Sequence, residues 1–126
     1  MDEAIDPGEL ITRYLRNRQH LRPALGRPHF SAFLPRWPDG AISVYRTTGL
    51  SASSIADLGA RYVASAEAPL KGCCGLVAAA FFAEALSIES APNPHERHAN
   101  VKGWTVEARN RIVAKKLADK ASLMVF

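Results

Sequence analysis

Residues 86–102 read LSIESAPNPHERHANVK, and this stretch decides the fold class. Leu86 to Ser90 alternates apolar and polar residues, as a strand does. The sequence Pro92-Asn93-Pro94 that follows is typical of a turn. Arg97 to Lys102 then predicts a second strand, which returns antiparallel to the first. A hairpin between sequence neighbours favours a mixed or antiparallel sheet over a doubly wound parallel one.

Further strands are expected on both sides of this hairpin. Ala41 to Thr47 is rich in β-forming residues and follows the turn signal Asp39-Gly40, so it predicts the clearest strand of the chain. His29 to Leu34, between prolines, fits a short edge strand. Ser122 to Phe126 predicts a last strand at the C-terminal side.

Four helices are expected between these strands. Asp6-Pro7-Gly8-Glu9 has the signature of a helix start, and Pro23 ends that helix. Ser51 is the expected N-cap of a second helix, and Thr105 that of the last. Cys73 to Leu86 is apolar nearly all round, which predicts a third helix at the centre of the core.

The resulting order is α-β-β-α-α-β-β-α-β, which predicts an α+β fold with a small mixed or antiparallel sheet and packed helices. The length of 126 residues is in the range of a single domain. We therefore expect one domain over 1–126. Within it, an Arg-rich N-terminal helix and connecting segment (1–38) precede an α+β core (39–126).

The sequence also predicts the surroundings of the protein. The longest uncharged stretch, Gly72 to Ala83, is much shorter than the roughly 20 residues that cross a bilayer. The acidic start from Met1 to Asp6 does not resemble a signal peptide. We therefore expect a soluble, cytoplasmic protein without a membrane partner. The two cysteines are adjacent, which excludes a disulfide framework.

A run of arginines suggests what the protein binds. The net charge is +4, and the segment from Leu10 to Pro38 holds six arginines, interleaved with aromatic residues, and no Asp or Glu. Guanidinium groups bind phosphates and carboxylates with two parallel hydrogen bonds, and aromatic rings stack on bases. An acidic partner, either nucleic acid or an anionic protein surface, is therefore expected. The candidate partner-binding residues are Arg13, Arg16, His20, Arg22, Arg27 and Arg36. The alternative is a solvated helix face whose arginine stems cover the core.

The segment Gly72-Cys73-Cys74-Gly75-Leu76-Val77 resembles the Cys-Ser-Gly-Leu-Val motif of the NlpC/P60 hydrolases, a papain-like family. The resemblance covers about six residues and implies a cysteine hydrolase in which Cys73 is the nucleophile and His98 the base. Gly72 stands where the family has Asp, and the Gly-Asp turn before the histidine is missing. The connection from Cys73 to His98 is also short for that fold. The alternative is that both cysteines are small buried fillers of the core.

A second resemblance lies later in the chain. His98-Ala99-Asn100-Val101-Lys102-Gly103-Trp104 resembles the His-Ala-Asn-Ile/Val-x-Gly-Trp stretch of small bacterial proteins of unknown function. The resemblance spans about residues 41–120 and implies an independent domain without indicating an activity. Thr105 stands where those proteins usually have proline.

Three functional hypotheses follow, and the sequence predicts no cofactor or metal for the leading one. The leading one is a non-enzymatic binding or accessory domain that contacts an acidic partner through its Arg-rich region. The second is a small hydrolase that uses Cys73 or Cys74 with His98 and Asn100. The third is a metal-dependent nuclease built on His95, Glu96 and His98, although a strand with alternating faces is the preferred interpretation of that spacing. No feature of the sequence indicates an oligomeric state.

Overall fold

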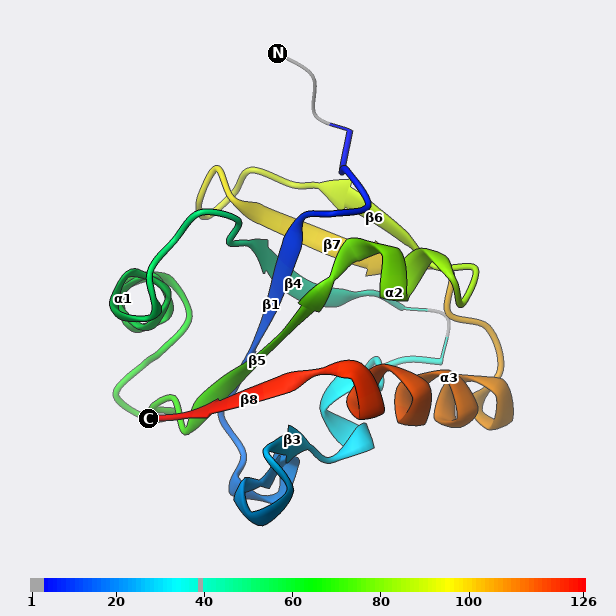
Figure 1. The fold of residues 1–126 in the computed structure, drawn as a ribbon, viewed down its shortest axis with the longest axis horizontal. Helices are drawn as coiled ribbons and strands as arrows, with labels where there is room; N and C mark the ends of the chain where they lie inside the picture. The colour runs from blue at the N-terminus through cyan, green and yellow to red at the C-terminus, as the bar shows by residue number, and fades with distance from the viewer. Residues whose placement is uncertain (1–3, 39) are drawn as a thin grey trace.

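A six-stranded sheet runs through the middle of the computed structural model, which describes residues 4–38 and 40–126 (Figure 1). The strand order is β6-β7-β4-β1-β5-β8, and every neighbouring pair is antiparallel. The strands of this sheet are β1 (Leu10–Leu15), β4 (Ile42–Arg46), β5 (Gly72–Val77), β6 (Ser87–Ser90), β7 (His98–Lys102) and β8 (Ser122–Val125). The helices are α1 (Ala52–Tyr62), α2 (Ala78–Phe82) and α3 (Glu107–Lys120). This arrangement confirms the predicted α+β class.

The connection between β1 and β4 contains short elements only. They are η1 (Arg18–His20), β2 (Leu21–Arg22), η2 (Pro23–Leu25), β3 (Arg27–Pro28) and η3 (Phe30–Phe33). The strands β2 and β3 form a separate two-stranded ribbon, which Figure 1 shows below the main sheet.

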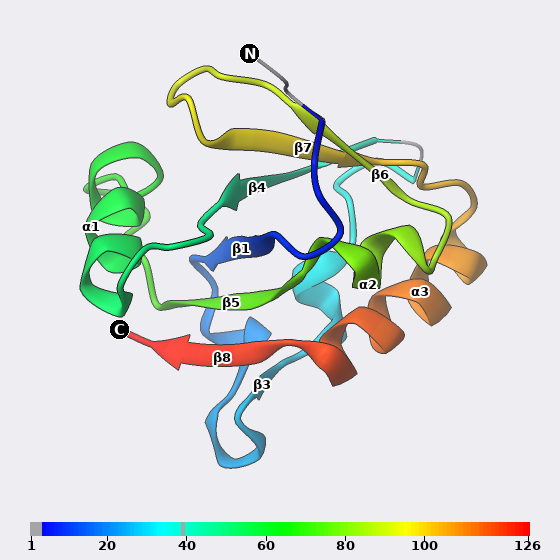
Figure 2. The ribbon, with the colours of Figure 1, turned by 45° about the horizontal axis from the view of Figure 1, so that its top comes forward.

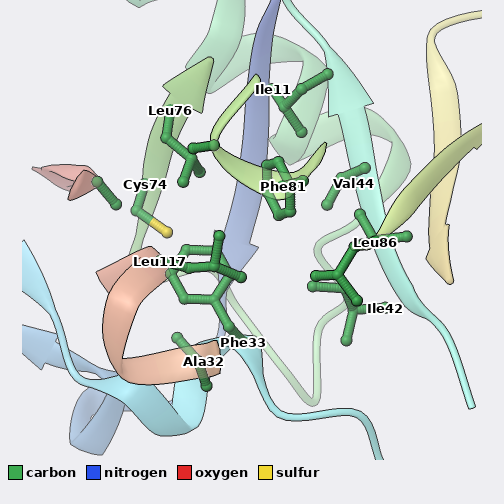
Figure 3. Packing of buried hydrophobic residues seen from close by; sticks show 14 of the residues in the cluster. Ile11, Ala32, Phe33, Ile42, Val44, Cys74, Leu76, Phe81, Leu86 and Leu117 are labelled. Atoms are coloured by element: carbon green, nitrogen blue, oxygen red, sulfur yellow. The ribbon is translucent and has the colours of Figure 1, made fainter. Parts of the chain in front are cut away.

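The two faces of the sheet are covered by different helices (Figures 1 and 2). On one face, α2, α3 and η3 enclose the larger apolar cluster, in which Phe81 and Leu117 pack with strand residues such as Ile11 and Val44. Figure 3 shows this cluster, with the Cys74 side chain of β5 among its apolar groups.

The other face packs against α1. Here Tyr14 of β1 and Tyr45 of β4 contact Ile55 and Leu58 of the helix in a second cluster. The Tyr14 hydroxyl donates a hydrogen bond to the Ile55 carbonyl oxygen at 2.5 Å. A side chain at Gly59 would collide with the Tyr14 ring, so the absence of one lets α1 approach the sheet closely.

The predicted first helix is wrong, because its residues form β1 at the centre of the sheet. The expected start signal does form its local hydrogen bonds: the Gly8 amide donates to Asp6 Oδ1 at 2.8 Å and the Asp6 amide to Glu9 Oε2 at 2.9 Å. They close a turn that leads into a strand. Because β1 is buried on both faces, its apolar residues recur at intervals that fit a helix equally well.

Burial on both faces also explains why the predicted helix at Cys73 to Leu86 is wrong. The predicted helix from Cys73 to Leu86 is a buried strand, β5, followed by the short helix α2. The glycines of β5 belong to the strand: a Cβ at Gly72 would lie 2.5 Å from the Met124 carbonyl oxygen on β8, so only glycine permits this close pairing.

Other expectations are confirmed. The structure contains the β6–β7 hairpin, and β4 and β8 lie where strands were predicted. Ser51 caps α1, with its Oγ accepting a hydrogen bond from the Ser54 amide at 3.2 Å. The predicted turn at Asp39-Gly40 falls partly outside the described residues, since Asp39 is not among them; the Gly40 amide donates to the Trp37 carbonyl oxygen at 2.8 Å.

Two local predictions differ from the structure. His29 to Leu34 contains the short helix η3 in place of an edge strand, and the His29 side chain caps it by accepting from the Ser31 amide. The N-cap of α3 is Val106 instead of Thr105, and no side chain caps it. Asn110 reaches back instead, accepting from the Thr105 amide at 3.0 Å and donating to the Pro38 carbonyl oxygen at 2.7 Å.

Candidate functional site

The two central strands of the sheet separate over part of their length. Their ladder pairs Ile11 with Arg46 and Thr12 with Tyr45. Beyond these pairs, β1 continues along β5 as far as Leu15, whereas β4 follows β7. Figure 1 shows the two strands diverging toward the start of β4. We call the resulting gap, between the second half of β1 and the start of β4, the fork.

The guanidinium group of Arg13 occupies the fork. Its Nε donates to the Ala32 carbonyl oxygen of η3 at 3.1 Å, and its Nη1 donates to the Ser43 carbonyl oxygen of β4 at 2.8 Å. Burial lowers the pKa of Arg13, which nevertheless stays charged at neutral pH. Arg13 therefore does not lie on a solvated helix face, which was the alternative interpretation of the arginine run, because its side chain bridges the separated strands.

A pocket of about 250 Å³ opens beside the fork. Its cationic and imidazole side chains come from the first 20 residues of the chain: Arg13, Arg16 and His20. Tyr14, Asn17, Ser43, Tyr45 and Val63 complete the lining, which therefore includes no acidic residue within the described chain. The pocket is positively charged and suits an anionic group.

The basic groups of this pocket are not equivalent. Arg16 is exposed, and no hydrogen bond or ion pair of the described residues engages its guanidinium. His20 is partly buried, and burial together with the charge of Arg13 lowers its pKa. At pH 7 the His20 ring is therefore neutral and contributes hydrogen-bonding atoms. Arg13 and Arg16 carry the positive charge of the pocket.

The remaining predicted partner-binding residues do not join this pocket. The Arg22 guanidinium donates to the carbonyl oxygens of Gln19 and Leu21, at 2.9 Å in each case. Arg27 forms an ion pair with Asp119 on α3, at 3.2 Å. Arg36 lies over the Trp37 ring, 5.5 Å from its centroid. These three arginines therefore interact with the protein's own groups outside the pocket.

Ser43, which the sequence did not single out, contacts His98 across the β4–β7 pair. Its Oγ lies 2.5 Å from His98 Nε2, while His98 Nδ1 lies 2.8 Å from the Ala91 carbonyl oxygen. A carbonyl only accepts, so Nδ1 carries the proton of the neutral ring and Nε2 accepts from the Ser43 hydroxyl. The Tyr45 ring packs edge-on against the imidazole, with 5.2 Å between centroids.

The structure does not bring the cysteines to His98. Cys73 lies on β5 and His98 on β7, and the strands β1 and β4 lie between them. Three strand spacings correspond to about 14 Å, much more than a hydrogen bond. Burial also raises the pKa of Cys73 to about 11 and that of Cys74 to about 12. Both thiols are thus neutral core groups at pH 7, as in the alternative interpretation. Asn100 pairs in register with Ser43 and Glu89, also away from the cysteines.

The histidines of the proposed metal site have different partners. The His95 ring packs against Tyr62 of α1, with 4.6 Å between centroids, and its Nδ1 accepts from the Arg97 amide. His98 is held by Ser43 and Ala91 instead. In residues 4–38 and 40–126, no group of three or more His, Cys, Asp or Glu side chains is placed to hold a metal ion. Glu96 accordingly belongs to no such group within the described chain.

A second hollow, of about 540 Å³, lies where α1 faces the residues before β7. Its lining includes the basic residues Arg61 and Arg97 and also the acidic residue Asp57; His95 lines it as well. Arg61 and Asp57 form an exposed ion pair at 3.0 Å, so part of its charge is satisfied internally. Although this hollow is larger, the pocket beside the fork has the stronger and less compensated charge.

Comparisons with protein-family models, with curated proteins and with solved structures find no match to this chain. The resemblances noted in the sequence therefore stay predictions. The site is defined by its own geometry, which places the half-buried Arg13, the exposed Arg16 and Ser43 around one pocket, with His98 hydrogen-bonded to Ser43.

Proposed function

We propose that this protein is a binding domain for an acidic partner, and that it holds a carboxylate or phosphate group of that partner in the pocket beside the fork. The observation that carries the proposal is the combination of Arg13 and Arg16 in a lining without acidic residues among those described. Arg13 is already fixed by two backbone carbonyls, so little side-chain freedom is lost when an anion binds. Arg16 closes over the anion from the solvent side.

The pocket favours a single anionic group over an extended nucleic-acid strand. A nucleic-acid surface places cations along a track that follows successive phosphates. Here, Arg22 and Arg27 are engaged with the protein's own groups, and Arg36 stacks on Trp37. A volume of about 250 Å³ matches one acidic side chain or one phosphate group with its immediate neighbours.

The expected location is the cytoplasm. No helix of the described chain is long and apolar enough to cross a membrane. Cys73 and Cys74 are free thiols buried in the core, which is typical of a reducing compartment.

Calorimetric titration with inorganic pyrophosphate and with citrate, at constant ionic strength, tests the proposal. Arg16→Glu should abolish binding, because it places a carboxylate at the mouth of the pocket. Arg36→Glu is the matched control, since it makes the same change of net charge at an exposed site away from the pocket. We expect it to bind as wild type does.

Two results would contradict the proposal. The first is equal weakening by Arg16→Glu and Arg36→Glu, which would indicate a diffuse electrostatic effect. The second is a preference for an oligonucleotide, with binding that falls steeply with salt and depends equally on both arginines. That result would favour nucleic acid over a single anionic group.

A further inference from the structure

We propose that Ser43 and His98 form a nucleophile–base pair that hydrolyses esters whose acyl part carries a carboxylate or phosphate group. The proposal rests on the anion binding proposed above, and adds a reaction to it. Neither residue type nor spacing in the sequence suggested this pair, because 55 positions separate the two residues.

The arrangement contains the three parts that activate a serine. The nucleophile, Ser43 Oγ, lies at hydrogen-bond distance from His98 Nε2. The base is oriented through its other nitrogen, which donates to the Ala91 carbonyl oxygen at 2.8 Å. This carbonyl takes the place that a carboxylate has in a Ser-His-Asp triad, since it fixes the tautomer that leaves Nε2 free to accept a proton.

The backbone holds this geometry. Ser43 and His98 lie on adjacent antiparallel strands, whose register pairs Ser43 with Asn100 and Tyr45 with His98. The Ala91 carbonyl belongs to the hairpin connection, which is closed by a hydrogen bond from the Ala91 amide to the His98 carbonyl oxygen at 2.9 Å. The nucleophile and the base therefore stand on rigid strands, as a preorganised site requires.

Ser43 and His98 differ in their exposure to solvent. Ser43 is exposed and lines the pocket beside the fork, whereas the His98 side chain is shielded, with the residue 9% exposed. A substrate or a water molecule in the pocket thus reaches the Ser43 hydroxyl, to which the His98 base is hydrogen-bonded. The charges of Arg13 and Arg16 would stabilise the negative charge that develops during the reaction and attract an anionic acyl group.

The reaction proceeds in two steps that balance. First, Ser43 Oγ attacks the ester carbonyl carbon as its proton passes to His98 Nε2. The bond to the alkoxy oxygen breaks, and the leaving alcohol takes that proton, which leaves an acyl-serine. Second, a water molecule gives a proton to Nε2 and attacks the acyl carbon. The bond to Ser43 Oγ breaks, Oγ recovers the proton from His98, and the acid is released.

A fluorophosphonate probe tests the pair without requiring the natural substrate. An activated serine forms an Oγ–P bond with the probe, fluoride leaves, and the serine proton passes to the base. Mass spectrometry of the labelled protein should locate the adduct on Ser43. Ser43→Ala should abolish labelling, and it should fold because the side chain is exposed. Ser87→Ala, at an exposed strand position outside the pocket, should be labelled as wild type is.

His98→Gln keeps a polar side chain of similar size but removes the base, so labelling of Ser43 should slow by about a hundredfold or more, as general-base catalysis predicts. Its melting temperature, measured in parallel, verifies that it is folded. Wild-type labelling rates in folded His98→Gln would overturn the pair. If His98→Gln is unfolded, the solvent isotope effect on wild-type labelling decides instead: transfer of the serine proton to a base predicts slower labelling in D2O, and equal rates in H2O and D2O would overturn the pair.

Ester substrates test the acyl specificity. The monoanionic succinyl ester of 4-nitrophenol should be hydrolysed with a higher kcat/KM than the neutral acetyl ester. Arg16→Glu should lower the ratio of the two values, and Arg36→Glu should not.

The outcomes separate the two proposals. If Ser43 is not labelled, the nucleophile–base pair is overturned, while the calorimetric test of anion binding keeps its own result. If Ser43 is labelled but the anionic ester is not preferred, the ester class proposed here is overturned, and the calorimetric titration alone decides the anion site.

Discussion

Replacing Phe81 by alanine should remove a central part of the core. Phe81 stands in the short helix α2, is 0% exposed, and meets Phe33 of η3 edge-on with 6.3 Å between ring centroids (Figure 3). The ring therefore joins two elements that both cover the same face of the sheet. Phe82, the next residue, is only partly buried at the margin of this cluster, so Phe82→Ala provides a matched control.

The expected loss in the free energy of unfolding follows from how deeply each phenylalanine ring is buried. Truncating a fully buried phenylalanine to alanine costs about 3–5 kcal/mol, which includes the cavity that remains. The aromatic pair with Phe33 accounts for about 0.5–1.5 kcal/mol of favourable geometry beyond the buried area. Phe82→Ala should cost about 1 kcal/mol, because part of that ring already contacts water.

Urea denaturation followed by circular dichroism measures both variants. With a slope of roughly 2 kcal/mol per molar urea, Phe81→Ala should lower the midpoint by about 2 M. Losses below about 1 kcal/mol at Phe81, or equal losses at both positions, would refute the assignment of α2 to the core.

Three further predictions follow from particular contacts. The Cys73 thiol, whose pKa burial raises to about 11, should react with iodoacetamide at pH 8 much more slowly than a free thiol, in the folded protein; rapid alkylation would contradict its burial. Asn110→Ala should cost about 1–3 kcal/mol, because it removes a buried side chain and its hydrogen bonds with the Thr105 amide and the Pro38 carbonyl oxygen, whereas Thr105→Ala should cost little; equal costs in thermal unfolding would contradict this difference. The hydrogen bond from Arg46 lowers the pKa of Glu9, so this pair should stabilise the fold above about pH 4.3 and lose that effect as pH falls through the lower folded-state pKa. Glu9→Gln should accordingly be less stable than wild type at pH 7 and nearly equal at pH 2, and a difference that persists at pH 2 would refute this linkage.

The site illustrates why sequence reasoning reached only some of its members. Arg16 and His20 were found from charge and composition, and both line the pocket. Arg13 was found for the wrong reason, since a helix would have placed it on a solvated face. No local pattern in the sequence singles out Ser43. Its contact with His98 follows only from the pairing of β4 with β7, which the sequence does not predict.

The sequence by itself determined the features that depend on neighbouring residues. The β6–β7 hairpin, the strand β4, the Ser51 cap of α1 and the α+β class all follow from turn residues, alternation and local capping. Each of these signals acts over a few residues, so a single chain displays it without reference to the rest of the fold.

Only the tertiary structure decided the centre of the sheet. β1 and β5 are buried on both faces, and a buried segment without a polar face has no periodicity that distinguishes a strand from a helix. Their conformation depends on the hydrogen bonds that distant strands supply: β4 and β5 for β1, and β1 and β8 for β5. The fork, the half-buried Arg13 and the Ser43–His98 pair all depend on these long-range pairings, because separate strands must first lie side by side before their side chains can meet.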